Sequence, residues 1–239
     1  EQRNAYRGVT RNQVKNLSDV FVNLGANKEL IGFSNSRLAY DEIISKFCYT
    51  VQQQTLKQKV TSTDLSEQYR EGIPFSDECI ITVEKTLKKF LTCIKNCDDI
   101  KFSLNKATLF SWLVFIRHNL DDDDFKLQKT IANFEFCKEY VKGKFKSTNP
   151  MCVDLYQDFQ NRLPFFEIML NTFNQRASMG STDALSIIYR DIIMDIFYST
   201  YWKPDAELLA FALETFSEKK NLNYVLEAIV KKYNWGEHF

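Results

Sequence analysis

The sequence has little glycine and little proline, with 7 Gly and 4 Pro among 239 residues. An average chain of this length would carry about 29 of the two together. Sandwiches, barrels and doubly wound sheets need many tight turns, so this shortage argues against them. It favours long helices joined by short loops, and the length suits one large domain or two small ones.

The chain also lacks a charge excess, since 31 Lys and Arg balance 31 Asp and Glu. A protein that coats DNA without regard to sequence usually carries a basic excess, so any nucleic-acid role here requires a local patch. The longest clean apolar run covers only residues 208–213, which excludes a membrane span. No secretory segment precedes the first residue, Glu1, so we expect a cytoplasmic fragment of a longer chain.

Histidine is scarce as well: His118 and His238 are the only two. Most hydrolase triads and metal-dependent nucleases need histidine, so the sequence predicts no catalytic residue in this chain. Cys93 and Cys97 lie one helical turn apart, but zinc sites take about four ligands and no second pair has suitable spacing. We therefore predict no metal site, no cofactor in this chain, and cysteines that are buried free thiols.

Aromatic residues are abundant, with 20 Phe and 11 Tyr, and helical apolar periodicity recurs along the chain. The pattern predicts helices at residues 10–25, 36–58, 76–96, 103–118, 122–142, 152–173, 183–201, 204–217 and 222–233. Pro164 is expected as a kink or boundary, and residues 62–74 as a loop. The fold class is therefore all-α: an irregular domain of about eight or nine helices over residues 1–239, with a sub-boundary in the loop 143–150.

The helix at residues 103–118 is apolar on nearly every face, which is typical of a helix at the centre of a helical domain. We expect Phe110, Trp112 and Phe115 to be almost inaccessible to solvent. Helix starts are expected at Thr10, at Ser76 and in the acidic run at residues 121–124, where carboxylates cap a helix better than they bind a cation.

The arginines indicate candidate binding sites better than the lysines do, because the planar guanidinium group can form two parallel hydrogen bonds to a carboxylate or phosphate. Arg3, Arg7 and Arg11 cluster near the start, and Arg37 opens the second helix. Arg190 lies in an apolar run, where a buried guanidinium needs partners. The sequence predicts a buried ion pair with Asp191, and a ligand pocket between helices is the alternative.

Three short segments resemble the region that follows the ParB-like catalytic domain in the GmrSD-type restriction family. They are EQRNA with Gly8 at residues 1–8, RLAYDEIISKF at residues 37–47, and FSLNKATLF at residues 102–110. The polar positions that match are Glu1, Arg3, Asn4, Arg37, Asn105 and Lys106.

The resemblance implies a role in anti-phage restriction. Family members pair a helical region with a ParB-like domain that hydrolyses a nucleoside triphosphate, so the parent protein would use a nucleotide and Mg²⁺. The family's Asp-Gly-Gln-Gln-Arg motif is absent here, so the resemblance carries the helical region and not the chemistry. It implies an upstream ParB-like domain and DNA as partners. The residues expected to face a DNA-sensing cleft are Arg3, Asn4, Arg7, Arg37, Asn105 and Lys106.

A second hypothesis belongs to another class: a non-catalytic helical module that binds a partner protein. Tyr198, Tyr201 and Trp202 lie together near the end of one predicted helix, and aromatic residues dominate interface hot spots. An exposed apolar patch would favour this hypothesis, and a basic cleft would favour the DNA-sensing one.

Overall fold

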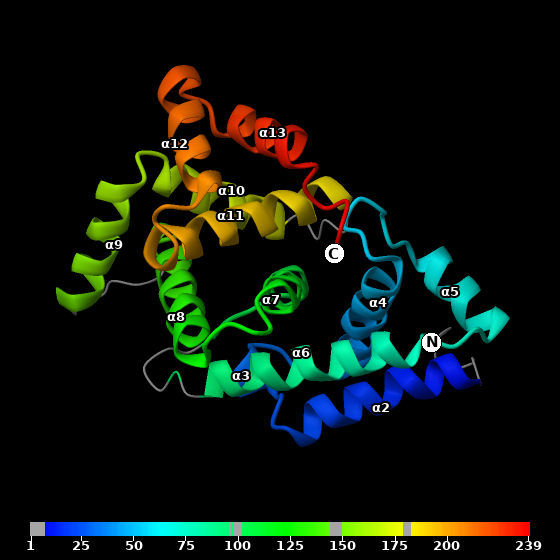
Figure 1. Ribbon diagram of the computed structural model, residues 1–239. Helices are drawn as coiled ribbons and strands as arrows, with labels where there is room; N and C mark the ends of the chain where they lie inside the picture. The colour runs from blue at the N-terminus through cyan, green and yellow to red at the C-terminus, as the bar shows by residue number, and fades with distance from the viewer. Residues whose placement is uncertain (1–7, 96, 98–101, 144–149, 179–182) are drawn as a thin grey trace.

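The computed structural model describes residues 8–95, 97, 102–143, 150–178 and 183–239, and in these ranges it contains helices and no strand (Figure 1). The α-helices are α2 (Val9–Asn23), α3 (Lys28–Ile31), α4 (Ala39–Gln53), α5 (Ser62–Glu71), α6 (Asp77–Lys95), α7 (Lys106–His118), α8 (Asp124–Val141), α9 (Pro150–Arg162), α10 (Phe166–Ser178), α11 (Ala184–Trp202), α12 (Glu207–Lys219) and α13 (Leu222–Tyr233), with a 3-10 turn at Ser36–Leu38. The all-α prediction is confirmed.

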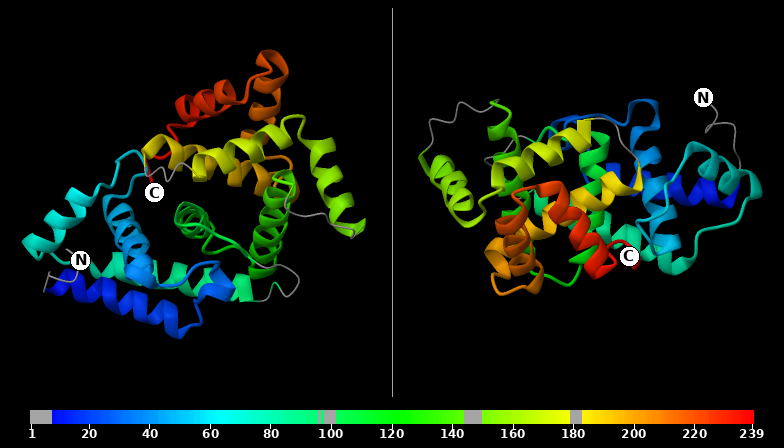
Figure 2. Two further views of the ribbon diagram at one scale, coloured as in Figure 1. Left: turned by 180° about the vertical axis from the view of Figure 1, so that it is seen from behind. Right: turned by 90° about the horizontal axis from the view of Figure 1, so that it is seen from above.

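Helix α7 lies at the centre, with α4, α6, α10 and α11 packed against it (Figures 1 and 2). Its apolar side chains point in every direction because each side meets a neighbouring helix. Trp112 is 0% exposed, Phe115 1% and Phe110 7%, so the predicted burial of these three is confirmed. The remaining helices extend this core outward, and buried residues from α2 to α13 form one contiguous cluster.

The predicted helix count is wrong, because the described residues form twelve α-helices. Helix α3 is a single turn that the apolar periodicity did not reveal. The long helix expected at residues 152–173 is two helices, since the backbone of Pro164 cannot continue α9 and the chain turns before α10.

The segment predicted to be a loop at residues 62–74 contains helix α5. Thr61 accepts a hydrogen bond from the backbone of Asp64, whose carboxylate accepts one from the backbone of Thr61. This reciprocal capping box starts the helix, while Leu65 and Tyr69 bury one face of it. The polar composition of residues 62–74 led to the loop prediction, although two buried apolar residues are enough to hold this helix on the core.

Two of the three predicted helix starts agree with the structure, and one does not. Ser76 Oγ accepts a hydrogen bond from the backbone of Cys79, and Asp123 caps α8 through the backbone of Lys126. Both predictions are confirmed. Thr10 does not cap α2: Gly8 occupies the N-cap position, and the Thr10 hydroxyl donates to the carbonyl of Ile73.

Five of the six cysteines are described with their side chains, and all five are free thiols: Cys48, Cys79, Cys93, Cys97 and Cys137. No helix in the described ranges has both the length and the apolar character needed to cross a membrane.

Candidate functional site: a basic pocket between four helices

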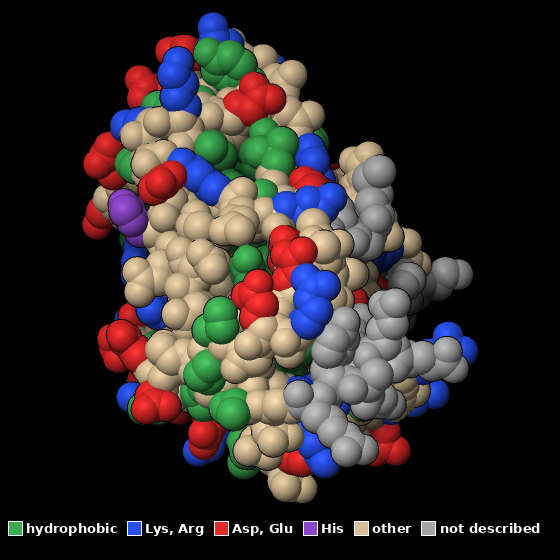
Figure 3. Space-filling model, turned by 90° about the vertical axis from the view of Figure 1, so that its right-hand side faces the viewer, with side chains coloured by type: hydrophobic (Ala, Val, Ile, Leu, Met, Phe, Trp, Pro, Cys, Tyr) green, Lys and Arg blue, Asp and Glu red, His purple; other side chains and the backbone are tan. Residues whose placement is uncertain are grey.

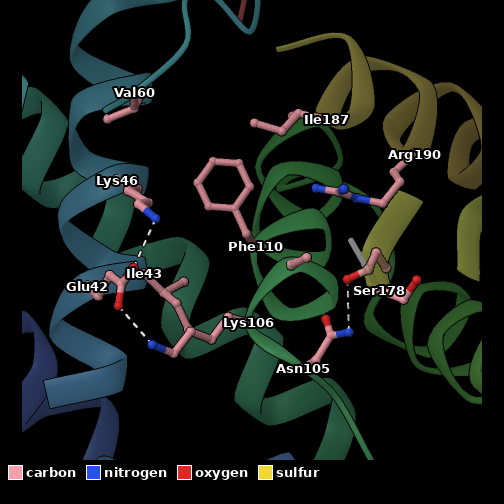
Figure 4. A pocket seen from close by; sticks show the side chains of 12 residues that line it. Glu42, Ile43, Lys46, Val60, Asn105, Lys106, Phe110, Ser178, Ile187 and Arg190 are labelled. Atoms are coloured by element: carbon pink, nitrogen blue, oxygen red, sulfur yellow. Dashed lines mark hydrogen bonds and ion pairs between the residues drawn. The ribbon is translucent and has the colours of Figure 1, made fainter. Parts of the chain in front are cut away.

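A pocket of about 310 Å³ lies between α4, α7, the end of α10 and α11 (Figure 4). We call it the basic pocket. Its apolar wall is formed by Ile43, Val60, Ala107, Phe110, Ala177 and Ile187. Its polar lining is formed by Glu42, Lys46, Asn105, Lys106, Ser178 and Arg190. The exposed side chains of Asn105, Lys106 and Ser178 mark its opening to solvent.

One carboxylate links two lysines at the α4 side of the basic pocket. Glu42 Oε1 lies 3.0 Å from Lys46 Nζ, one turn further along α4, and Glu42 Oε2 lies 2.8 Å from Lys106 Nζ on α7. Lys46 and Glu42 are mostly shielded, with side chains 18% and 22% exposed. Coulomb interactions among these groups are therefore less screened than on an open surface.

The start of α7 forms the floor between the two charged sides. Asn105 is its N-cap residue: the side-chain oxygen accepts a hydrogen bond from the backbone of Thr108. The Asn105 amide nitrogen donates to the carbonyl of Ala177, at 3.1 Å. Asn105 thus ties the beginning of α7 to the end of α10, which fixes the distance between the walls of the pocket.

Arg190 closes the opposite side and is only 1% exposed. Its Nε donates to Ser111 Oγ at 2.8 Å, and its NH1 donates to the carbonyl of Arg176 at 3.1 Å. Burial lowers the pKa of Arg190 to about 10, although the nearby Asp183 carboxylate opposes that shift. The guanidinium is still charged at neutral pH, and its hydrogen bonds hold it rigidly.

The structure brings three of the predicted site residues into this one pocket: Asn105, Lys106 and Arg190. Arg37 lies elsewhere, exposed in the turn that precedes α4. Arg3, Asn4 and Arg7 lie outside the described residues. Glu42 and Lys46 also line the pocket and are not among the predicted site residues. Their spacing of four on one helix is the sequence signal that could have identified them as a pair.

Arg190 and Asp191 were predicted to form an ion pair, and the structure gives them different surroundings. Both are buried, at 1% and 2% exposure. Asp191 Oδ2 accepts a hydrogen bond from Trp235 Nε1 at 2.8 Å and lies 3.4 Å from His118 Nε2. It therefore contacts the end of α7 and the segment after α13, whereas Arg190 contacts the middle of α7 and α10.

Asp191 belongs to a second pocket of about 380 Å³, which also contains His118, Asp195 and Trp235. We call it the aspartate pocket. Burial and the neighbouring Asp191 raise the pKa of Asp195 to about 6. Burial lowers the pKa of His118, but the attraction of Asp191 outweighs it and leaves that pKa above its ordinary value.

Several cations among the first 60 residues pair with carboxylates. Arg11 pairs with Asp41 at 3.0 Å, and Lys57 pairs with Glu237. On the face shown in Figure 3, acidic and basic side chains are interspersed. Lys138 on α8 is 2% exposed and pairs with the equally buried Glu135, so it adds nothing to a basic surface.

The three aromatic residues proposed as an interface, Tyr198, Tyr201 and Trp202, differ in exposure. Tyr198 is 1% exposed and donates to Asp122 Oδ2, so it belongs to the core. Tyr201 is 43% exposed, and Trp202 donates its indole N–H to Thr130 Oγ1. Among the described residues, no group of three His, Cys, Asp or Glu side chains is arranged to hold a metal ion.

No protein-family model, curated protein or solved structure matches this chain. Function is therefore inferred from the two pockets and the residues that line them.

Proposed function

We propose that this chain is a helical ligand-binding module and that the basic pocket is its binding site. The observation that supports this proposal is the combination of an apolar wall with a few converging polar groups in a hollow of about 310 Å³. Pockets for small molecules typically have this composition and this size or somewhat more. Binding sites between the helices of an all-α protein are common for the same reason: the gaps between packed helices are where apolar walls meet.

The walls of the basic pocket are held in place without a ligand. Asn105 links α7 to α10, and Arg190 links α11 to both of those helices through Ser111 and the carbonyl of Arg176. A pocket whose walls are fixed in advance loses little conformational entropy when a ligand enters. This pre-organisation favours binding over a purely structural role for the same polar residues.

Filling the pocket tests the proposal. Ala107 lines it and is half-buried on α7, so Ala107→Phe would place a ring in the space that a ligand needs. We expect this variant to keep its helical circular dichroism and lose binding of small aromatic probes, measured by ligand-observed NMR. Ala210→Phe, at an exposed position of α12, is the matched control and should bind as the wild type does. If Ala107→Phe binds the probes as tightly as the wild type does, the probes bind outside the basic pocket.

The role implied by the resemblance, DNA sensing beside a ParB-like catalytic domain, remains a separate prediction. Asn105 and Lys106, two of its matched positions, border the basic pocket. Nucleotide hydrolysis by the parent protein, assayed with and without DNA, tests it. A Lys106→Met change that removes DNA stimulation would connect the pocket to that role.

A further inference from the structure

We infer that the ligand of the basic pocket is a small anion with an apolar body, its carboxylate or phosphate group lying between Lys46 and Lys106. This inference rests on the proposed function and deepens it by naming the class of ligand. Three observations support it: an internal carboxylate that already occupies the position between the lysines, the charge balance of the pocket, and the composition of its opposite wall.

Glu42 shows what chemistry this position accepts. Its two oxygens contact ammonium groups from two different helices, at 3.0 Å and 2.8 Å. The two lysines therefore converge on a single carboxylate-sized anion, and they do so from positions 60 residues apart in the chain. A ligand anion that enters here can share or replace the contacts of Glu42, because Lys106 is 53% exposed and free to follow it.

The charge balance leaves room for a further anion. Lys46 and Lys106 carry two positive charges and share one carboxylate, that of Glu42. On the opposite side, the charge of Arg190 lies near the Asp183 carboxylate, so the excess positive charge is at the two lysines. The apolar wall excludes water from one side of these charges, which strengthens their field inside the pocket. A cationic ligand would meet net repulsion there, and a neutral ligand would use only the apolar wall.

The body of the ligand is expected to be flat and apolar. In Figure 4, the Phe110 ring lies between the lysine side of the pocket and Arg190, with Val60 and Ile187 beyond it. An aromatic ring seated against Phe110 gains both apolar burial and an aromatic contact. Aryl carboxylates and aryl phosphates combine such a body with the anionic group that the lysines contact.

A pair of probes with the same body and different charge tests this inference. The affinities of 2-naphthoate and its uncharged isostere 2-naphthamide are measured by isothermal titration calorimetry at low salt. We expect naphthoate to bind about tenfold more tightly, since hydrogen bonds to charged groups are roughly twice as strong as neutral ones. The advantage should shrink as salt is added. 2-Naphthyl phosphate, compared with naphthoate, decides which anionic group the lysines prefer.

Single variants then assign the effect to the lysines. Lys46→Met and Lys106→Met should each weaken naphthoate about fivefold and leave naphthamide unchanged. Glu42→Gln should tighten naphthoate, because the two lysines lose their competing carboxylate. Lys88→Met is the matched control, since Lys88 pairs with Glu84 one turn away on α6 but lies outside the basic pocket.

The outcomes separate the two proposals. If naphthoate and naphthamide bind equally, and both are lost in Ala107→Phe, the pocket binds ligands and the anion inference is wrong. If neither probe binds the wild type at millimolar concentration, the proposed function itself is overturned. If Lys88→Met weakens naphthoate as much as Lys46→Met does, the effect is a general one of net charge and the inference is also wrong.

Discussion

The basic pocket and the aspartate pocket lie along the same pair of helices, α7 and α11, and have opposite chemistry. Arg190 borders the first and Asp191, the next residue, borders the second. Consecutive residues of a helix point about 100° apart, so one step along α11 changes the pocket and the charge together. A sequence pattern that places two charged residues side by side therefore says little about whether they meet.

The two pockets also differ in how their charges are compensated. In the basic pocket, Glu42 contacts two lysines, and Arg190 donates to Ser111 Oγ and lies near the Asp183 carboxylate. In the aspartate pocket, the described contacts include no hydrogen bond or ion pair to Asp195, and its pKa rises to about 6. The first pocket should thus respond to anions and salt, and the second to pH.

The aspartate pocket is also bordered by the segment after α13, which is distant in sequence from α7. The segment after α13 lies against α11 and the end of α4, near the label C in Figure 1. Leu56 N and Thr55 Oγ1 both donate to the carbonyl of Gly236, and Phe239 N donates to the carbonyl of Gln54. This pocket depends on one segment staying docked, whereas the basic pocket is built from helices of the core.

The largest expected effect is on α7, the helix that contributes lining residues to both pockets. Trp112 is fully buried on α7, between the residues that line the two pockets, and its indole N–H donates to Glu135 at 2.8 Å. Trp112→Ala should lower the free energy of unfolding by about 3–5 kcal/mol, measured by urea denaturation. Both pockets should lose their properties together.

Trp112→Phe separates packing from the hydrogen bond. It retains most of the apolar volume but leaves Glu135 without the indole donor, so we expect a loss of about 1–3 kcal/mol. Unfolding of Trp112→Ala at the same urea concentration as the wild type would show that α7 is not the shared core of the two pockets.

The second effect is a pH dependence confined to the aspartate pocket. Asp195 has a pKa of about 6 in the folded protein and an ordinary value of 3.8. The folded state therefore holds this proton more tightly than the unfolded state, and stability falls as pH rises from about 4 through 6. Asp195→Asn should remove that fall and stabilise the protein at pH 7 by about 1–3 kcal/mol.

His118 provides the internal control for this prediction. Its raised pKa stabilises the fold at low pH, and that contribution is lost as pH rises through the folded pKa, above the ordinary value of 6.5. Asp195→Asn should keep most of this second decline, because Asp191 raises the His118 pKa more than Asp195 does, whereas His118→Gln should remove it and keep the first. An Asp195→Asn variant with the full wild-type pH profile between 4 and 6 would contradict the assignment.

The local apolar periodicity of the sequence was sufficient to predict most helices, but it could not predict the two pockets. The apolar stripes of α6, α7 and α13 predicted those helices to within a few residues, because burial of one face is what stabilises them. The pockets depend on contacts between distant segments: Arg190 meets Ser111 across 79 residues, and Trp235 meets Asp191 across 44. The periodicity of apolar residues within a segment does not determine which helices pack against one another. The partners of Arg190 and Asp191 could therefore not be predicted from the sequence.

The smallest effect concerns the segment that closes the aspartate pocket. Gly236 has a φ of +82°, and a Cβ added there would lie 3.0 Å from Ile188 and 3.2 Å from Leu56. Gly72, at the end of α5, has a φ of +68° and open space around it. Alanine at either position incurs the left-handed backbone cost, and only Gly236→Ala adds crowding against α11.

Gly236→Ala should therefore be less stable than Gly72→Ala by about 1 kcal/mol, measured in parallel urea titrations. The extra loss should come with a change in the near-ultraviolet signal of Trp235, since its bond to Asp191 depends on the docked segment. Anion binding in the basic pocket should be unchanged, because Gly236 does not line it. Equal stabilities for the two variants would mean that Ile188 yields to the new methyl group, and the closing segment would then be less firmly docked than its hydrogen bonds indicate.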